Sequence, residues 1–127
     1  KNFEGVKRRF SIIYNNSKNL IIDDYAHHPE EIKVTLNSLR YVTKKKLITI
    51  FEPHRYSRIK GMKKDFLSCF NLADVILILP IYTAGEKKDN KISNELMEKS
   101  LSNKYKNKLV KSVKGNTTFF KYLQKIF

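Results

Sequence analysis

The 127-residue chain is the size of one ordinary domain, and its 41% of apolar residues suffice for a single core. No apolar run approaches the roughly 20 residues that cross a bilayer, and the first ten residues, KNFEGVKRRF, lack the apolar stretch of a signal peptide. The single cysteine, Cys69, cannot form an internal disulfide and is expected to be a buried, unreactive side chain. We therefore expect a soluble, cytoplasmic domain rather than a membrane-spanning or disulfide-stapled one.

The formal net charge of +14 raises the hypothesis of a polyanion-binding protein, because neutralised phosphates supply most of the affinity for nucleic acids. The distribution of the charge argues against it, since 21 of the 26 basic residues are lysines spread through every segment. Four of the five arginines form two clusters, one of Arg8 and Arg9 and one of Arg55 and Arg58. A guanidinium binds phosphate or carboxylate through a planar fork, so these clusters are better candidates for anion chemistry than the total charge. A non-enzymatic polyanion-binding module remains a less favoured alternative.

Two short strands and a helix are predicted first along the chain. Residues 10–14 (FSIIY) and 20–23 (LIID) flank the turn-forming stretch NNSKN and predict a hairpin or two sequential strands. Pro29 suits the first position of a helix, and the acidic residues after it complement the positive end of the helix dipole. The helix is expected to be closed by the lysines at 44–46. Its apolar residues repeat every three or four positions: Ile32, Leu36, Leu39 and Val42.

Two continuous apolar strands are predicted next, at residues 47–51 (LITIF) and 75–79 (VILIL). A polar loop over residues 52–61 separates the first of them from a helical pattern. The apolar positions of that pattern are Met62, Phe66, Leu67 and Phe70. Strands that are apolar at every position are typical of a parallel sheet covered on both faces.

The last third of the chain predicts a short helix from an N-cap at Ser93 through Leu101, an edge strand at residues 109–113 and a final helix capped by Asn116. The whole pattern predicts an α/β fold with a Rossmann-like open, mostly parallel sheet and helices on both faces. Ligands of such sheets bind beyond the carboxyl ends of the strands, which here carry DDYAHHP, EPHRYSR and PIYTAGE. Neither G-x-x-x-x-G-K-[ST] nor G-x-G-x-x-G occurs, so the chain is not expected to cradle a nucleoside triphosphate by itself.

Asp23, Asp24, Tyr25, His27 and His28 are crowded at one strand end. A metal site is disfavoured there, because adjacent histidines project in different directions and no third group completes a shell. In a structural interpretation Asp24 caps the turn and one histidine packs under the helix. In a functional one, a carboxylate at this rim accepts hydrogen bonds from ribose hydroxyls, and the amides of the following helix favour an anion.

Arg55 and Arg58 form the second cluster, beside His54 and Tyr56. If the loop turns into the following helix, their spacing of three residues places both guanidiniums on one face, where they fit a carboxylate or phosphate. The alternative is a solvated basic loop.

Four segments then resemble one family. GVKRRF, DDYAHHPEEI, EPHRYSR and YTAGE are similar, in order and spacing, to segments of the C-terminal domain of Mur ligases. The resemblance covers residues 1 to about 86 and implies that the whole chain, 1–127, is such a domain without its N-terminal and central partners. It implies an enzyme of peptidoglycan synthesis whose N-terminal domain binds a UDP-sugar and whose central domain holds most of ATP and Mg2+.

Within the family the segments are most similar to the branch that joins L-alanine to UDP-N-acetylmuramate through an acyl phosphate. An alternative is the recycling branch that attaches an intact murein tripeptide to the same sugar nucleotide. The resemblance implies that Arg9 and Asp24 contact ATP. It places the acceptor site at Tyr25, His27, Arg55 and Arg58, with the two arginines as the catalytic pair. It leaves His28 and His54 open between a site role and packing, and Arg8 as structural.

Overall fold

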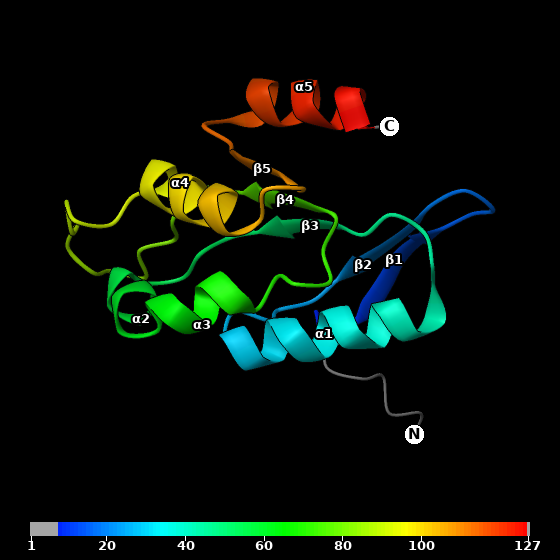
Figure 1. Ribbon diagram of the computed structural model, residues 1–127, viewed down its shortest axis with the longest axis horizontal. Coiled ribbons are helices and arrows are strands. Elements are labelled where there is room, and N and C mark those ends of the chain that lie inside the picture. The colour runs from blue at the N-terminus through cyan, green and yellow to red at the C-terminus, as the bar shows by residue number, and fades with distance from the viewer. Residues whose placement is uncertain (1–7, 127) are drawn as a thin grey trace.

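The structure is a computed structural model that describes residues 8–126. This part of the chain begins with a β-hairpin (Figure 1). Strands β1 (Ser11–Asn15) and β2 (Leu20–Asp23) pair antiparallel, with a bulge between Ile12 and Tyr14. The side-chain oxygen of Asn16 accepts hydrogen bonds from two backbone amides of the turn, which closes it. The hairpin expected from the sequence is thus confirmed. Residues 5–7 of the first family-like segment lie outside the described residues.

Helix α1 (Pro29–Val42) begins where proline predicts it. Its N-cap is His28, whose Nδ1 accepts from the amide of Glu30, while the Glu31 carboxylate accepts from the amides of His27 and His28, each at 3.1 Å. Burial raises the pKa of Glu31, but the hydrogen bonds from these two amides and the nearby imidazoles prevail and lower it overall.

The end of α1 differs from the expectation. The helix stops at Val42 because Thr43 takes extended backbone, so the lysines at 44–46 lie beyond the helix instead of closing its last turn. Lys45 instead donates from Nζ to the carbonyl oxygens of Ser17 and Lys18 in the hairpin turn, which ties this loop to the hairpin.

A parallel sheet of three strands forms the centre of the fold. Its order is β3 (Ile48–Phe51), β4 (Val75–Ile78) and β5 (Leu109–Ser112), and all four residues of the middle strand β4 are buried. This confirms two continuous apolar strands and an edge strand at about 109–113. The mixed α/β architecture and the parallel sheet are those expected.

The sheet is not continuous with the hairpin, in contrast to the single open sheet that the sequence suggests. Among the described residues β2 pairs only with β1, and β3 pairs only with β4. The edge of β2 that faces away from β1 therefore has no strand partner within residues 8–126. A cavity lies between the two strands instead.

The remaining helices cover the two faces of the parallel sheet (Figure 1). Helices α2 (Tyr56–Gly61), α3 (Lys63–Ser68) and α4 (Asn94–Lys104) pack on the same side as α1. Helix α5 (Asn116–Ile126) lies alone across the other. The first helix after β3 thus begins inside the segment expected to be a polar loop. Ser93 does cap α4, by accepting from the amide of Leu96, but α4 runs three residues beyond the expected end at Leu101.

The larger core lies under α1, α3 and α4 and contains Phe66, Phe70, Ile76 and Leu101, all essentially inaccessible. Cys69 belongs to it, and burial raises the pKa of its thiol to about 12, which fits an unreactive side chain. Among the helices of residues 8–126, none is long and apolar enough to cross a membrane.

Asp74 links the end of α1 to the sheet and supports a prediction about stability. Its Oδ2 accepts from the amide of Leu47 at 2.7 Å and from a guanidinium nitrogen of Arg40 at 2.8 Å. Burial raises the pKa of Asp74, but these hydrogen bonds and the charge of Arg40 outweigh it, so the folded pKa is below the ordinary value. Because the folded pKa is lowered, the stabilisation is complete above the unfolded pKa of about 4 and is lost as the pH falls through the folded value.

We expect Asp74→Ala to lower the free energy of unfolding by about 1 kcal/mol at neutral pH, since the carboxylate is half exposed. The difference from the unsubstituted chain should shrink below pH about 4. Urea unfolding at pH 7 and at lower pH measures it. Asp65→Ala is the matched control, because the exposed Asp65 carboxylate makes no hydrogen bond among the described residues. Equal effects of the two substitutions at pH 7 would contradict this role of Asp74.

Candidate functional site

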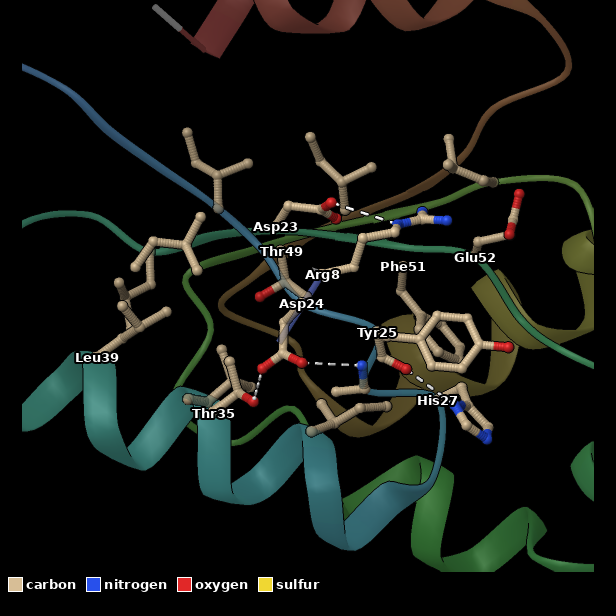
Figure 2. Close-up of a pocket in the computed structure, with 18 of the residues that line it drawn as sticks. Arg8, Asp23, Asp24, Tyr25, His27, Thr35, Leu39, Thr49, Phe51 and Glu52 are labelled. Carbon is tan, nitrogen blue, oxygen red and sulfur yellow. Dashed lines mark hydrogen bonds and ion pairs between the residues drawn. The ribbon is translucent and has the colours of Figure 1, made fainter. Parts of the chain in front are cut away.

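A cavity of about 390 Å³ lies between β2, β3 and α1, and it extends along β3 to the loops that follow the two strands (Figure 2). Its deeper wall is apolar and comes from isoleucine and leucine side chains of the strands and the helix. Its other end carries charged, phenolic and imidazole groups: Arg8, Asp23, Asp24, Tyr25, His27, Glu52 and His54. A mostly apolar cavity with a few convergent polar groups is the usual form of a small-molecule site.

Asp24 fixes the loop after β2 onto α1. Its Oδ1 accepts from the amide of Ala26 at 3.1 Å, and its Oδ2 accepts from the hydroxyl of Thr35 at 2.6 Å (Figure 2). This is the capping role that the structural interpretation gave to Asp24. A carboxylate offers about four lone-pair sites, so the two bonds leave acceptor capacity toward the cavity. The two interpretations of Asp24 are therefore compatible.

An imidazole and phenol cluster joins the loops after β2, β3 and β4. The rings of His27 and His54 stack with centroids 5.5 Å apart, and Tyr25 meets both rings edge to face. The ring of Tyr82, from the loop after β4, has its centroid 5.1 Å from the centroid of the His54 ring. We call these four residues the ring cluster. The three loops that the sequence predicted at one rim thus lie together, although β2 and β3 do not pair.

Hydrogen bonds set the orientation of the two imidazoles. Nδ1 of His27 lies 2.8 Å from the carbonyl oxygen of Tyr25, and because a carbonyl only accepts, Nδ1 carries the proton and Nε2 of the neutral ring keeps its lone pair. Nε2 of His54 lies 3.1 Å from the carboxylate of Glu52, to which it donates. In the neutral tautomers, Nε2 of His27 and Nδ1 of His54 therefore keep lone pairs that can accept a hydrogen bond.

The first arginine cluster is divided in the structure. Arg8 lines the cavity, donates from Nε to the Asp23 carboxylate at 3.3 Å and places its guanidinium 5.9 Å from the centre of the Tyr25 ring. Arg9 is exposed and is not among the residues that line the cavity. Arg8, for which only a structural role was expected, therefore lies at the candidate site, whereas the assignment of Arg9 to ATP stays a prediction.

The second arginine cluster lies outside the lining of the cavity. Arg55 is the N-cap of α2 with a φ of 65°, and Arg58 follows in the first turn of that helix. Neither lines the cavity, and neither guanidinium has a hydrogen-bond or ion-pair partner among the described residues. His54, which directly precedes Arg55 in the sequence, belongs to the ring cluster. The structure thus brings Asp24, Tyr25 and His27 around one cavity, and it places neither Arg55 nor Arg58 in the lining of that cavity.

Sequence reasoning missed three residues near this site. The hydroxyl of Thr49, on the cavity wall, is buried and has no hydrogen-bond partner in residues 8–126. Glu52 orients His54, and Glu86 bonds to Ser57 at the start of α2. A threonine inside the apolar run LITIF was a detectable signal, and Glu52 and Glu86 each stood inside a family-like segment without a role. Within residues 8–126 no group of three or more His, Cys, Asp or Glu side chains is placed to hold a metal ion.

An α/β sheet with polar loops gathered at the carboxyl ends of its strands defines a Rossmann-like ligand-binding domain. The family model described as "Mur ligase, glutamate ligase domain" matches residues 8–125. The chain therefore belongs to the Mur ligase family, as the four segments in the sequence predicted.

Curated relatives and solved structures agree with this membership. Over 111 residues, which are 84% of this chain and 22% of the relative, the chain is 50% identical to the UDP-N-acetylmuramate–L-alanine ligase of Rickettsia typhi. The crystal structure of the UDP-N-acetylmuramate–alanine ligase from Thermotoga maritima matches with a TM-score of 0.66 at 29% identity, covering 98% of this chain and 24% of that one. A murein peptide ligase from Psychrobacter arcticus matches with a TM-score of 0.68 at 21% identity, over 95% of this chain and 25% of that one, and shows the shared fold alone. The chain spans about a quarter of the length of these proteins.

Proposed function

We propose that this chain is the C-terminal domain of a cytoplasmic, ATP-dependent ligase that joins L-alanine to UDP-N-acetylmuramate during peptidoglycan synthesis. The observation that carries the proposal is the 50% identity to the Rickettsia typhi L-alanine ligase over 84% of the chain. In this proposal the whole chain, residues 1–127, is one acceptor-binding domain that closes over ATP. The domains that hold the UDP-sugar and the phosphate loop belong to other parts of the full-length protein.

The proposed reaction has two steps. The muramyl carboxylate attacks the γ-phosphorus of ATP, which forms an acyl phosphate and releases ADP. The amine of L-alanine then attacks the acyl carbon, a tetrahedral intermediate forms, and its collapse breaks the bond to phosphate and leaves an amide. The amine loses a proton on the way. Both steps build negative charge, which positioned cations stabilise.

The residues of this chain are assigned by their chemistry. Arg55 and Arg58 have guanidiniums without a partner in residues 8–126, and these fit the alanine carboxylate and the charge of the acyl phosphate. The free Nε2 of His27 is suited to accept a hydrogen bond from the alanine amine, and Tyr25 lies against that imidazole. Asp24 keeps acceptor capacity for the ribose hydroxyls of ATP, and Arg9 is assigned to its phosphates. Mg2+, when bound, would offset phosphate charge, and we assign its ligands to the central domain.

A comparison of phosphate release by the isolated chain and the full-length protein tests this division of labour. With UDP-N-acetylmuramate, Mg2+, ATP and L-alanine, the full-length protein should release phosphate at an ordinary enzymatic rate. The 127-residue chain should release none above background, because its sequence has no phosphate loop to hold ATP. Turnover by the isolated chain would overturn the division of labour, and a full-length protein without activity would overturn the proposed reaction.

A further inference from the structure

Helix α2 has no cap from its own sequence neighbours. The N-cap residue is Arg55, whose side chain makes no capping hydrogen bond. The cap comes instead from Glu86, which lies 29 residues further along the chain, after β4. Its Oε2 accepts from the amide of Ser57 at 3.1 Å, and its Oε1 accepts from the hydroxyl of the same serine. One carboxylate thus satisfies a free donor of the first helical turn and a side chain beside it.

The same distant segment also holds the chain immediately before α2. The carbonyl oxygen of Tyr82 accepts from the amide of Arg55 at 2.9 Å, and the amide of Tyr82 donates to the carbonyl oxygen of Pro53 at 2.8 Å. Gly85 then takes a φ of 84°, which glycine adopts without strain, and the turn that results brings Glu86 back toward Ser57. Residues 82–86 therefore bind the chain on both sides of Arg55.

The backbone of Arg55 needs such support. A φ of 65° is uncommon for a residue with a side chain and carries strain, which persists only where the surrounding structure imposes it. Without the bonds to residues 82–86, the turn can relax to a negative φ. That change would re-aim Arg55 and shift the start of α2, on which Arg58 lies.

We propose that Glu86 is a positioning residue that fixes the orientation of Arg55 and Arg58 without touching the substrates itself. This inference rests on the proposed function, because it assigns the two arginines to the acceptor. Both carboxylate oxygens of Glu86 are engaged by Ser57, and neither forms an ion pair with an arginine within the described chain. Glu86 therefore holds the backbone while it leaves the guanidiniums free for anions.

The charge state of Glu86 agrees with this role. The hydrogen bonds from the hydroxyl and amide of Ser57 lower the pKa of the Glu86 carboxyl, and the positive charge of Arg55 adds to the effect. Because the folded pKa is below the ordinary value, the carboxylate is ionised, and its bonds to Ser57 are intact, throughout the neutral range. The support is lost only in acid, as the pH falls through the lowered pKa.

The kinetic test uses the full-length protein with L-alanine and ATP varied in turn. Glu86→Ala should lower kcat/KM for the amino acid between about tenfold and a hundredfold, with KM for ATP nearly unchanged, because misplaced guanidiniums weaken only the acceptor side. Glu86→Gln should keep most of the activity, because its amide oxygen still accepts from the Ser57 amide. The double variant with Ser57→Ala and Glu86→Ala should lose no more kcat/KM than Glu86→Ala alone, since both substitutions remove the same interaction. Glu95→Ala, a glutamate of α4 paired with Lys114, is the matched control and should leave the kinetics unchanged.

Three kinetic results would overturn the inference: a loss within twofold for Glu86→Ala, an equal loss toward ATP and the amino acid, or additive effects of the two alanine substitutions. A second measurement separates this failure from failure of the proposed function. In the 127-residue chain the amide proton resonance of Ser57 should titrate with the lowered pKa of Glu86, and Glu86→Gln should abolish that titration. If L-alanine is not a substrate but the titration is observed, the proposed function is wrong and Glu86 still holds α2. If the Ser57 amide resonance does not titrate with Glu86, the inference is wrong, whichever substrate the full-length protein uses.

Discussion

Replacing Arg55 or Arg58 by lysine is expected to lower kcat/KM for L-alanine by roughly a hundredfold in the full-length protein. Lysine keeps the positive charge but loses the planar fork that binds a carboxylate or phosphate through two parallel hydrogen bonds. The loss of one such contact in a transition state typically costs about 2 to 4 kcal/mol, and each factor of ten in rate corresponds to about 1.4 kcal/mol. Neither guanidinium has a partner in the part of the chain that the structure describes, so no residue there should compensate for the lost fork.

Steady-state kinetics with each substrate varied in turn measures this effect. KM for L-alanine or kcat should suffer while ATP binding stays near normal, and Arg9 or Asp24 substitutions should show the opposite bias, toward ATP. Arg40→Lys is the matched control, since Arg40 bonds to Asp74 and to the carbonyl oxygen of Leu72 and is not among the residues that line the cavity. A value of kcat/KM for L-alanine near that of the unsubstituted protein in both variants would remove Arg55 and Arg58 from the acceptor site.

Phe70→Ala is expected to lower the free energy of unfolding by about 3 to 5 kcal/mol, the usual cost of emptying a buried aromatic site. Phe70 is 0% exposed and meets the ring of Phe51 edge to face, with centroids 5.3 Å apart, so it joins the helical layer to β3. A cavity at this point removes contacts from both layers and cannot close without moving the strand that leads to the site.

Urea unfolding of the 127-residue chain, followed by circular dichroism, gives the two free energies. Phe120→Ala is the control of equal chemistry, because Phe120 lies on α5 and is 60% exposed, and it should change stability by no more than about 0.5 kcal/mol. A loss of less than about 1 kcal/mol at Phe70 would mean that the core under α3 is not packed as described.

Elements whose signals are local were predictable from the sequence. Pro29 and the acidic residues after it place the start of α1, and the apolar run at residues 75–79 identifies the buried strand β4 within one residue. The separation of β2 from β3 was not predictable, because the apolar pattern of a strand does not specify which strand it pairs with. Helix α2 was also missed, because its residues lie in the polar segment 52–61 and the predicted helical pattern began only at Met62.

The candidate site shows the same limit. Placing Asp24, Tyr25 and His27 near one another required only that they follow one strand, and the loops at the strand ends were expected to meet. The bond between Asp24 and Thr35 and the cap that Glu86 gives to Ser57 join residues that are 11 and 29 positions apart. Such pairs depend on how α1 and the loop after β4 pack, and the family-like segments show which residues matter without showing which of them touch.

The product that the full-length protein makes shows which acceptor it uses. The protein is incubated with UDP-N-acetylmuramate, Mg2+ and ATP, with either L-alanine or the intact murein tripeptide as the acceptor, and the amide products are measured by mass spectrometry over a range of acceptor concentrations. We expect a product enlarged by one alanine residue, formed with a much higher kcat/KM than the tripeptide product. Preferential use of the tripeptide, or no amide with either acceptor, would contradict it.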